Sequence, residues 1–177
     1  IENLIDKKIE KNLSKQKKLG RVKRLESGNK DYIKILKKNF PNNFNLKGLR
    51  IIIDCANGAG YKAGPELLKS LGAKVFAIGV KPNGMNINKK CGVEHLAKIG
   101  NYVRKNKLNF GVSIDGDADR IVFVNKHGKL IEGDKIIAFI AESILKKGSK
   151  LITTIMTNSI IEKRLSSKKI EVLRTDV

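Results

Sequence analysis

The chain has 177 residues, of which 41% are hydrophobic, and this allows one domain or one domain with part of another. Its net charge is +20, yet it contains no Trp, its aromatic content is 5%, and no RNA-recognition or zinc-finger pattern appears. We therefore interpret the excess of Lys as a solvated surface that can attract anionic ligands, and we expect no nucleic-acid partner.

The sequence lacks the features that direct a protein to a membrane or to an oxidising compartment. No apolar stretch reaches the length of a transmembrane helix, and the first residues lack the apolar run of a signal peptide. The two cysteines, Cys55 and Cys91, form no metal-type or redox-type pair, which is typical of a reducing cytosol. We expect a cytoplasmic protein without a membrane partner. Because the chain starts at Ile1 and stops within a pattern at Val177, we also expect both ends to be cut.

Two helices are expected before the first strand. Residues 1–24 predict a helix that packs on another part of the protein, since apolar residues recur there at near-helical spacing: Ile1, Leu4, Ile5, Ile9 and Leu13. A second helix is expected to begin at Asp31, a suitable N-cap, and to continue to Phe40. Pro41 ends this helix because the residue before a proline avoids the α region.

From residue 49 onward, segments typical of strands and helices alternate. Strands are expected at 50–54, 74–79, 110–114, 121–125, 130–131, 151–155 and 170–173. Helices are expected at 62–71, 94–105, 134–146 and 159–165. This order predicts an α/β fold, in which a mixed sheet flanked by helices is followed by part of a second, similar α/β domain.

The most informative segment is the acidic loop, residues 115–120, between two predicted strands. Asp115, Asp117 and Asp119 alternate with small residues, and Arg120 follows them. Like charges this close repel one another, so either their pKa values rise or a cation binds between them. Carboxylate oxygens without a neighbouring His or Cys favour Mg2+ or Mn2+ over zinc. The loop therefore predicts a magnesium site at a strand end, where ligand sites gather in α/β proteins.

Three other interpretations of the acidic loop fit less well. An EF-hand requires Gly at position six and Glu at position twelve, and counting from Asp115 these positions hold Arg120 and Lys126. An aspartyl-phosphate phosphatase loop usually places Thr or Val where this chain has Asp119. A charged turn between two strands remains the simplest alternative, although three Asp with a Gly and an Arg exceed what a turn requires.

A second glycine-rich segment resembles a dinucleotide fingerprint in form only. Residues 58–63 read Gly-x-Gly-x-x-Ala between a predicted strand and a predicted helix. A nicotinamide site would also need an acidic residue at the end of the next strand, and that place holds Ile78, Gly79 and Val80. The glycines more simply allow a tight turn and a close approach of the backbone to a neighbour.

Together these motifs resemble the α-D-phosphohexomutase superfamily. The acidic loop is similar to that family's metal loop, Asp-Gly-Asp-x-Asp-Arg, and residues 54–61 (DCANGAGY) resemble the start of its second domain. Residues 82–92 (PNGMNINKKCG), with His95 soon after, are similar to the phosphoglucosamine mutase branch. The resemblance runs along nearly the whole chain and is strongest from 49 to 134.

The resemblance implies a fold, a cofactor and a reaction. Members of the family have four domains around a cleft, and a phosphoserine in the first domain exchanges its phosphoryl group with a sugar phosphate through a bisphosphate intermediate. For this branch, the reaction interconverts glucosamine 6-phosphate and glucosamine 1-phosphate, a precursor of UDP-N-acetylglucosamine and peptidoglycan. Asp115, Asp117 and Asp119 would hold Mg2+, and Arg120 would be the catalytic residue that donates to the phosphoryl oxygens.

The same resemblance implies how the chain is divided. Residues 1–41 would be the tail of domain I with linking helices, 42–130 domain II with the metal loop, and 131–177 the N-terminal part of a truncated domain III. The phosphoserine loop, the sugar-contacting loop and domain IV would lie outside the chain, so we expect this piece to be inactive alone.

Several positions depart from the family's usual pattern, all of them outside the metal loop. Lys30 and Asp31 stand where the family often has Gly-Arg, and Ser159 follows Met156-Thr157-Asn158 where Gly is common. These departures concern substrate detail and not the metal, and three alternatives stay open. They are a phosphomannomutase or phosphoglucomutase of the same superfamily, a Mg2+-dependent phosphohydrolase, and a basic nucleic-acid-binding module.

Overall fold

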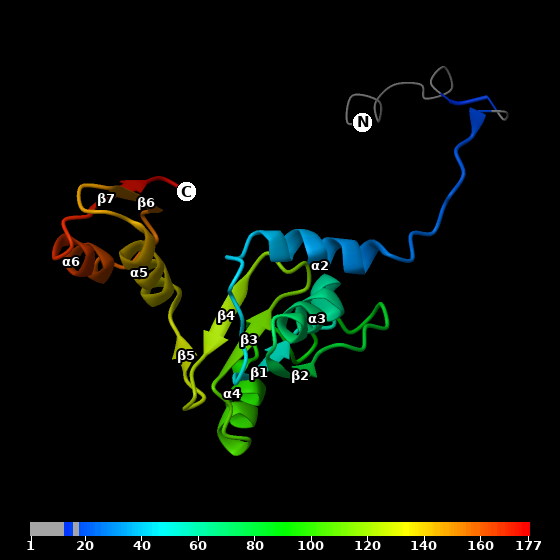
Figure 1. Cartoon of the computed structure of the whole chain (residues 1–177), viewed down its shortest axis with the longest axis horizontal. Coiled ribbons are helices and arrows are strands. Elements are labelled where there is room, and N and C mark those ends of the chain that lie inside the picture. Colours follow the sequence, from blue (N-terminus) through cyan, green and yellow to red (C-terminus); the bar gives the residue numbers. More distant parts are fainter. Residues whose placement is uncertain (1–12, 16–17) are drawn as a thin grey trace.

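A computed structural model describes residues 13–15 and 18–177 (Figure 1). Most of the helix predicted over 1–24 lies outside the described residues, and residues 19–24 have no regular secondary structure. Helix α2 spans Gly28–Lys38, so it begins before the predicted N-cap Asp31. The amide of Asp31 donates to the carbonyl of Ser27, which places Asp31 within the first turn. A negative charge in that turn complements the helix dipole.

The first unit is a five-stranded mixed sheet, as the sequence predicts. Its strands lie in the order β2-β1-β3-β4-β5, where β2 and β3 flank β1 in parallel and β4 and β5 are antiparallel additions. The strands are β1 (Arg50–Asp54), β2 (Lys74–Ile78), β3 (Phe110–Ile114), β4 (Ile121–Val124) and β5 (Leu130–Ile131). Because β1, β2 and β3 are parallel, their carboxyl ends meet at one edge of the sheet.

Two apolar clusters cover the two faces of this sheet. On one face, Ile51 and Ile53 of β1 pack with residues that include Leu68 of helix α3 (Ala63–Ser70). On the other face, Ile52 packs with Ile99 and Val103 of helix α4 (Leu96–Lys105). Strand β1 alternates its side chains between these clusters, so it is buried on both sides, as parallel strands in α/β folds are.

The second unit is a smaller arrangement of two helices and two parallel strands. It comprises α5 (Gly133–Ile144), β6 (Lys150–Thr154), α6 (Ile160–Ser166) and β7 (Glu171–Thr175). Ala138 and Ala141 of α5 pack with Ile161 and Leu165 of α6 over one face of the strands. Small residues on α5 allow the two helices to approach closely.

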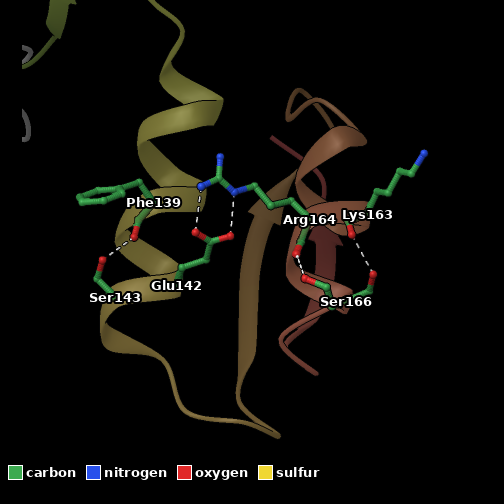
Figure 2. A network of polar contacts seen from close by, with 7 residues as sticks. Phe139, Glu142, Ser143, Lys163, Arg164 and Ser166 are labelled. Atoms are coloured by element: carbon green, nitrogen blue, oxygen red, sulfur yellow. Dashed lines mark hydrogen bonds and ion pairs between the residues drawn. The ribbon is translucent and has the colours of Figure 1, made fainter.

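A forked ion pair joins the two helices of the second unit (Figure 2). Arg164 of α6 donates through Nε and an Nη atom to the two carboxylate oxygens of Glu142 on α5, at 2.7 and 2.8 Å. The pair lowers the pKa of Glu142, chiefly through the hydrogen bonds from Arg164. The other face of β6 is open, since the side chain of Ile152 is 68% exposed.

Strands β1, β3 and β5 have the predicted ends, and the ends of the other elements differ from the sequence predictions by no more than three residues. The largest shift on the sheet side is at α4, which begins at Leu96 and not at residue 94, because the amide of His95 donates to the carbonyl of Gly92 and closes a turn there. At Gly79, a φ of +62° ends β2 one residue earlier than expected. Within the described part of the chain, no helix combines the length and the apolar character needed to cross a membrane.

Candidate metal centre

The acidic loop joins β3 to β4 at the edge where the parallel strands end. Asp115 follows the last residue of β3 and is 2% exposed, whereas Asp117 and Asp119 are exposed. One carboxylate oxygen from each of the three lies within 4.8 Å of the others. The structure therefore gathers the three predicted ligands into one cluster with two solvent-facing carboxylates.

Arg120 holds the buried carboxylate of the cluster. Its backbone amide donates to Oδ1 of Asp115 at 3.1 Å, and its Nε donates to Oδ2 at 2.8 Å. The same Nε lies 3.8 Å from Oδ1 of Asp119. The Arg120 side chain is 61% exposed, so the remaining guanidinium nitrogens are open to solvent and can reach a ligand.

The charges and hydrogen bonds of the loop shift the pKa values of Asp115 and Asp119 in opposite directions. Burial acts to raise the pKa of Asp115, but the backbone and side-chain hydrogen bonds from Arg120 outweigh it and lower the pKa to about 2. The pKa of Asp119 is raised, first by the negative charge of Asp117, and then by partial desolvation and by the negative charge of Asp115. Asp115 is therefore firmly ionised, while the repulsion at Asp119 is what a bound cation would relieve.

The loop is shaped by contacts with the glycine-rich turn, residues 55–60, that follows β1. The short 3-10 helix η3 (Ala59–Tyr61) begins there, and the amide of Ala59 donates to the carbonyl of Gly116 at 2.7 Å. A Cβ at Gly58 would overlap that same carbonyl oxygen. Ala118 takes a φ of +64°, which turns the chain between Asp117 and Asp119. The glycines thus serve a close backbone approach, as the sequence suggested.

The Asn-rich loop, residues 82–92, closes the other side of the site. Asn57 accepts from the amide of Lys81 through Oδ1 and donates through Nδ2 to the carbonyl of Asn86. Asn88 donates its amide to the carbonyl of Ala56, and its side chain lies against Gly116. These asparagines were not among the predicted site residues. The density of Asn in residues 82–92 could have indicated Asn86 and Asn88, whereas Asn57 stands alone in the glycine-rich turn.

The two cysteines near the site are not nucleophiles. Cys55 and Cys91 are both buried free thiols. Burial, and then the charge of Asp54, raise the pKa of Cys55 to about 12, and the same two causes raise the pKa of Cys91. Both stay protonated near neutral pH, so they supply no thiolate for a soft metal or for covalent chemistry.

The donor set fits a hard divalent cation. Three carboxylates from one loop offer oxygen ligands, two of them reachable from solvent, which is the ligand type that Mg2+ and Mn2+ prefer. Mg2+ keeps several waters or phosphate oxygens when it is bound by a few carboxylates. The open side of the cluster leaves room for such ligands.

Two family models match the chain in adjacent segments. Residues 30–128 match phosphoglucomutase/phosphomannomutase, alpha/beta/alpha domain II, and residues 132–177 match alpha/beta/alpha domain III of the same family.

Curated relatives share the sequence at high identity. The chain is 60% identical over 172 residues to a phosphoglucosamine mutase of Pelagibacter ubique, a match that covers 94% of the chain and 38% of the relative. It is 41% identical over 181 residues to a phosphoglucosamine mutase of Phenylobacterium zucineum, covering 100% of the chain and 40% of the relative. The chain thus spans 38–40% of the length of these relatives.

Solved structures share the fold at low sequence identity. A phosphoglucomutase/phosphomannomutase family protein from Burkholderia thailandensis superposes with a TM-score of 0.72 at 20% identity, over 84% of this chain and 33% of that one. The exocytosis-sensitive phosphoprotein parafusin (phosphoglucomutase) from Paramecium gives a TM-score of 0.60 at 19% identity, over 82% of this chain and 29% of that one. At these identities the likeness supports the α/β fold alone.

Proposed function

The chain belongs to the phosphoglucomutase/phosphomannomutase family, and from this premise we propose that it carries the metal loop of a Mg2+-dependent phosphosugar mutase. The proposed reaction interconverts glucosamine 6-phosphate and glucosamine 1-phosphate through a phosphoserine and a bisphosphate intermediate. The relatives named phosphoglucosamine mutase support this choice of sugar. Because the chain spans 38–40% of their length, the activity belongs to the longer protein.

We propose the same division of the chain as the sequence suggested. Residues 1–41 are the tail of domain I with linking helices, 42–130 are domain II, and 131–177 are the first part of domain III. The change from the five-stranded sheet to the separate β6–β7 pair supports a boundary near 131, as do matched segments of 30–128 and 132–177. The phosphoserine, the sugar-contacting loop and domain IV are proposed to lie in other parts of the polypeptide.

The residues that carry the proposal are the three carboxylates of the acidic loop. Asp115, Asp117 and Asp119 would hold Mg2+, which when bound supplies Lewis-acid polarisation of a phosphoryl oxygen. Asp115 is fixed by Arg120 and buried, so it defines where the cluster sits. Asp117 and Asp119 face solvent and can close around a cation without moving buried groups.

Arg120 has a second proposed role toward the substrate. Its Nε is committed to Asp115, which leaves the two terminal nitrogens of the fork to donate to phosphoryl oxygens. Phosphoryl transfer depends on charge neutralisation and positioning more than on covalent activation by the protein. An arginine whose position is fixed by one carboxylate and whose end is exposed meets both requirements.

A chimaera tests the proposed function. The 177 residues would replace the matching stretch of the Pelagibacter ubique phosphoglucosamine mutase, and glucosamine phosphate isomerisation would be measured. We expect activity, and we expect it to disappear with Asp117→Asn while Asp134→Asn, a change in the first turn of α5, retains it.

Other outcomes of this assay would contradict the proposal. A folded chimaera that acts on mannose or glucose phosphates but not on glucosamine phosphates would mean that the sugar is wrong. Release of inorganic phosphate without isomerisation would mean a phosphohydrolase. Activity that survives Asp117→Asn would mean that the acidic loop does not hold the catalytic metal.

A further inference from the structure

Outside the acidic loop, the carboxylate of Asp54 is also buried. Asp54 is the last residue of β1 and is 0% exposed. A carboxylate removed from water is unfavourable unless hydrogen bonds replace its hydration. The role proposed above does not use this group, so its burial needs another reason.

The two oxygens of Asp54 hold two separate segments of the chain. Oδ1 accepts from the amide of Ala56 at 3.0 Å, within the glycine-rich turn. Oδ2 accepts from the amide of Gly92 at 3.1 Å, at the end of the Asn-rich loop, 38 residues away in sequence. A third segment fits closely against the group, because a Cβ at Gly79 would overlap Oδ1. One carboxylate thus accepts hydrogen bonds from the chain after β1 and from the chain before α4, and it lies against the chain after β2.

The segments that Asp54 holds are the ones that contact the acidic loop. The glycine-rich turn donates from Ala59 to the carbonyl of Gly116, and Asn88 of the Asn-rich loop lies against Gly116. Gly116 stands between the ligands Asp115 and Asp117. Gly116 is therefore contacted by both the glycine-rich turn and the Asn-rich loop. Each of these two segments donates a backbone amide to the Asp54 carboxylate.

The sheet register places Asp54 beside the strand that leads into the acidic loop. Asp54 on β1 pairs with Ser113 on β3, two residues before Asp115. The hydroxyl of Ser113 is buried and has no hydrogen-bond partner among the residues that the structure describes. Asp54 and Ser113 therefore lie side by side at the end of the sheet, and Asp115 follows Ser113 by two residues, just beyond the end of β3.

We propose that Asp54 is a positioning residue for the metal centre, which it serves by clamping the glycine-rich turn and the Asn-rich loop against Gly116. This inference rests on the proposed metal-binding function. Asp54 itself is not in the carboxylate cluster of Asp115, Asp117 and Asp119. It acts on metal affinity through the backbone, as outer residues of metal sites act by orienting the ligands.

The test uses Asp54→Asn in the complete 177-residue chain. The amide is nearly the same size as the carboxylate, but its NH2 group cannot accept from a backbone amide, so one of the two clamps is lost. The matched control is Val103→Ala, which removes buried volume from the same sheet face on α4 without touching either loop. Both variants are compared well below their melting temperatures, with folding checked by circular dichroism.

Two measurements distinguish the effect of Asp54 on the position of the loop from its effect on metal binding. The first is hydrogen exchange at the amides of Ala59 and Ala118, which donate to Gly116 and Asp115 and not to Asp54. The second is Mn2+ affinity measured by electron paramagnetic resonance. We expect Asp54→Asn to speed exchange at both amides and to weaken Mn2+ binding about tenfold or more, and Val103→Ala to change neither.

Each outcome decides the proposal. Unchanged exchange at Ala59 and Ala118 in Asp54→Asn would overturn it, and so would faster exchange with unchanged Mn2+ affinity. An equal loss of affinity in Val103→Ala would show a general effect of stability and would also overturn it. If the unaltered chain binds no Mn2+, the proposed metal function fails, and the exchange data still show whether Asp54 holds the loop.

Discussion

Strands β1 and β6 each begin a strand–helix–strand unit with a parallel partner, but water reaches them very differently. Strand β1 has β2 and β3 on its two sides and an apolar cluster on each face, so Ile52 is 0% exposed. Strand β6 pairs with β7, and its apolar cluster lies on one face, so Ile152 is 68% exposed.

The polar contacts of the two units follow this difference in burial. In the first unit, the carboxylates of Asp54 and Asp115 are buried and accept hydrogen bonds that set the shape of loops. In the second unit, Glu142 and Arg164 form a partly exposed ion pair that joins two helices (Figure 2). The buried carboxylates thus lie at the end of the sheet that is covered on both faces, and the candidate metal centre lies beside them.

The largest expected effect is on metal binding, which we assign to the first unit alone. Asp117→Asn is expected to abolish Mn2+ binding by the isolated chain, since it removes a charged ligand from the cluster. Asp134→Asn in the second unit is expected to leave binding unchanged. Isothermal titration calorimetry with Mn2+ measures both, and binding that depends on Asp134 would place the site in the other unit.

The next effect tests burial directly with the same side chain in the two strands. Ile52→Ala is expected to lower the free energy of unfolding by about 2–5 kcal/mol because it leaves a cavity between β1 and α4. Ile152→Ala is expected to change it by no more than about 0.5 kcal/mol. Urea titrations followed by residue-resolved NMR would measure each unit separately.

Stability losses opposite to these would change the conclusion that β1 is covered on both faces and β6 on one. A large loss with Ile152→Ala would show that the open face of β6 is covered in solution by another surface. A small loss with Ile52→Ala would show that the cluster on the α4 face collapses around the missing atoms.

A smaller effect is expected at two carboxylates of the acidic loop, whose ionised forms change the stability of the fold in opposite directions. The pKa of Asp115 is lowered from 3.8 to about 2, so its ionised form stabilises the fold above pH 4, and this contribution is lost as the pH falls toward 2. The pKa of Asp119 is raised, so its ionised form destabilises the metal-free fold at neutral pH.

At pH 7 without metal, Asp115→Asn is therefore expected to lower the melting temperature and Asp119→Asn to raise it. Thermal unfolding followed by circular dichroism, in a chelating buffer, compares them. Lowering the pH from 5 to 2 should destabilise the unaltered chain more than Asp115→Asn. A shift of the same sign in both variants would mean that charge repulsion does not dominate at Asp119.

The smallest effect is expected at the surface of the second unit. Arg164→Lys keeps the positive charge but loses the two parallel hydrogen bonds to Glu142. The melting temperature should fall less than in Ile52→Ala, and the loss should shrink at high salt because the pair is partly exposed. A loss that is large and independent of salt would show that the fork is more protected than its exposure indicates.

Much of this fold could be predicted because the deciding signals are local. The apolar runs at Ile51–Ile53 and the alternation of strands and helices are enough for a mixed α/β sheet. The acidic loop was identified because three carboxylates within five residues require a cation or a pKa shift, and the structure does gather them.

The missed features depend on contacts between distant residues. Nothing near Asp54 in sequence indicates that its carboxylate accepts from Gly92, because that contact exists only once β1 and the Asn-rich loop are folded together. The start of α2 was placed at Asp31 because Asp is a common N-cap, whereas the helix begins one turn earlier, after Ser27. Local preference does not choose between two polar residues of similar capping ability.

The contact between Gly58 and Gly116 makes the acidic loop a poor candidate for transplantation. The two backbones approach so closely that a side chain at Gly58 would overlap the carbonyl of Gly116 and one at Gly116 would overlap Ile87. A peptide that carried residues 115–120 alone would lack the glycine-rich turn and the Asn-rich loop, whose contacts hold the acidic loop in its conformation. A protein engineer who wished to graft this motif would have to move the turn after β1 with it, as a matched pair of segments.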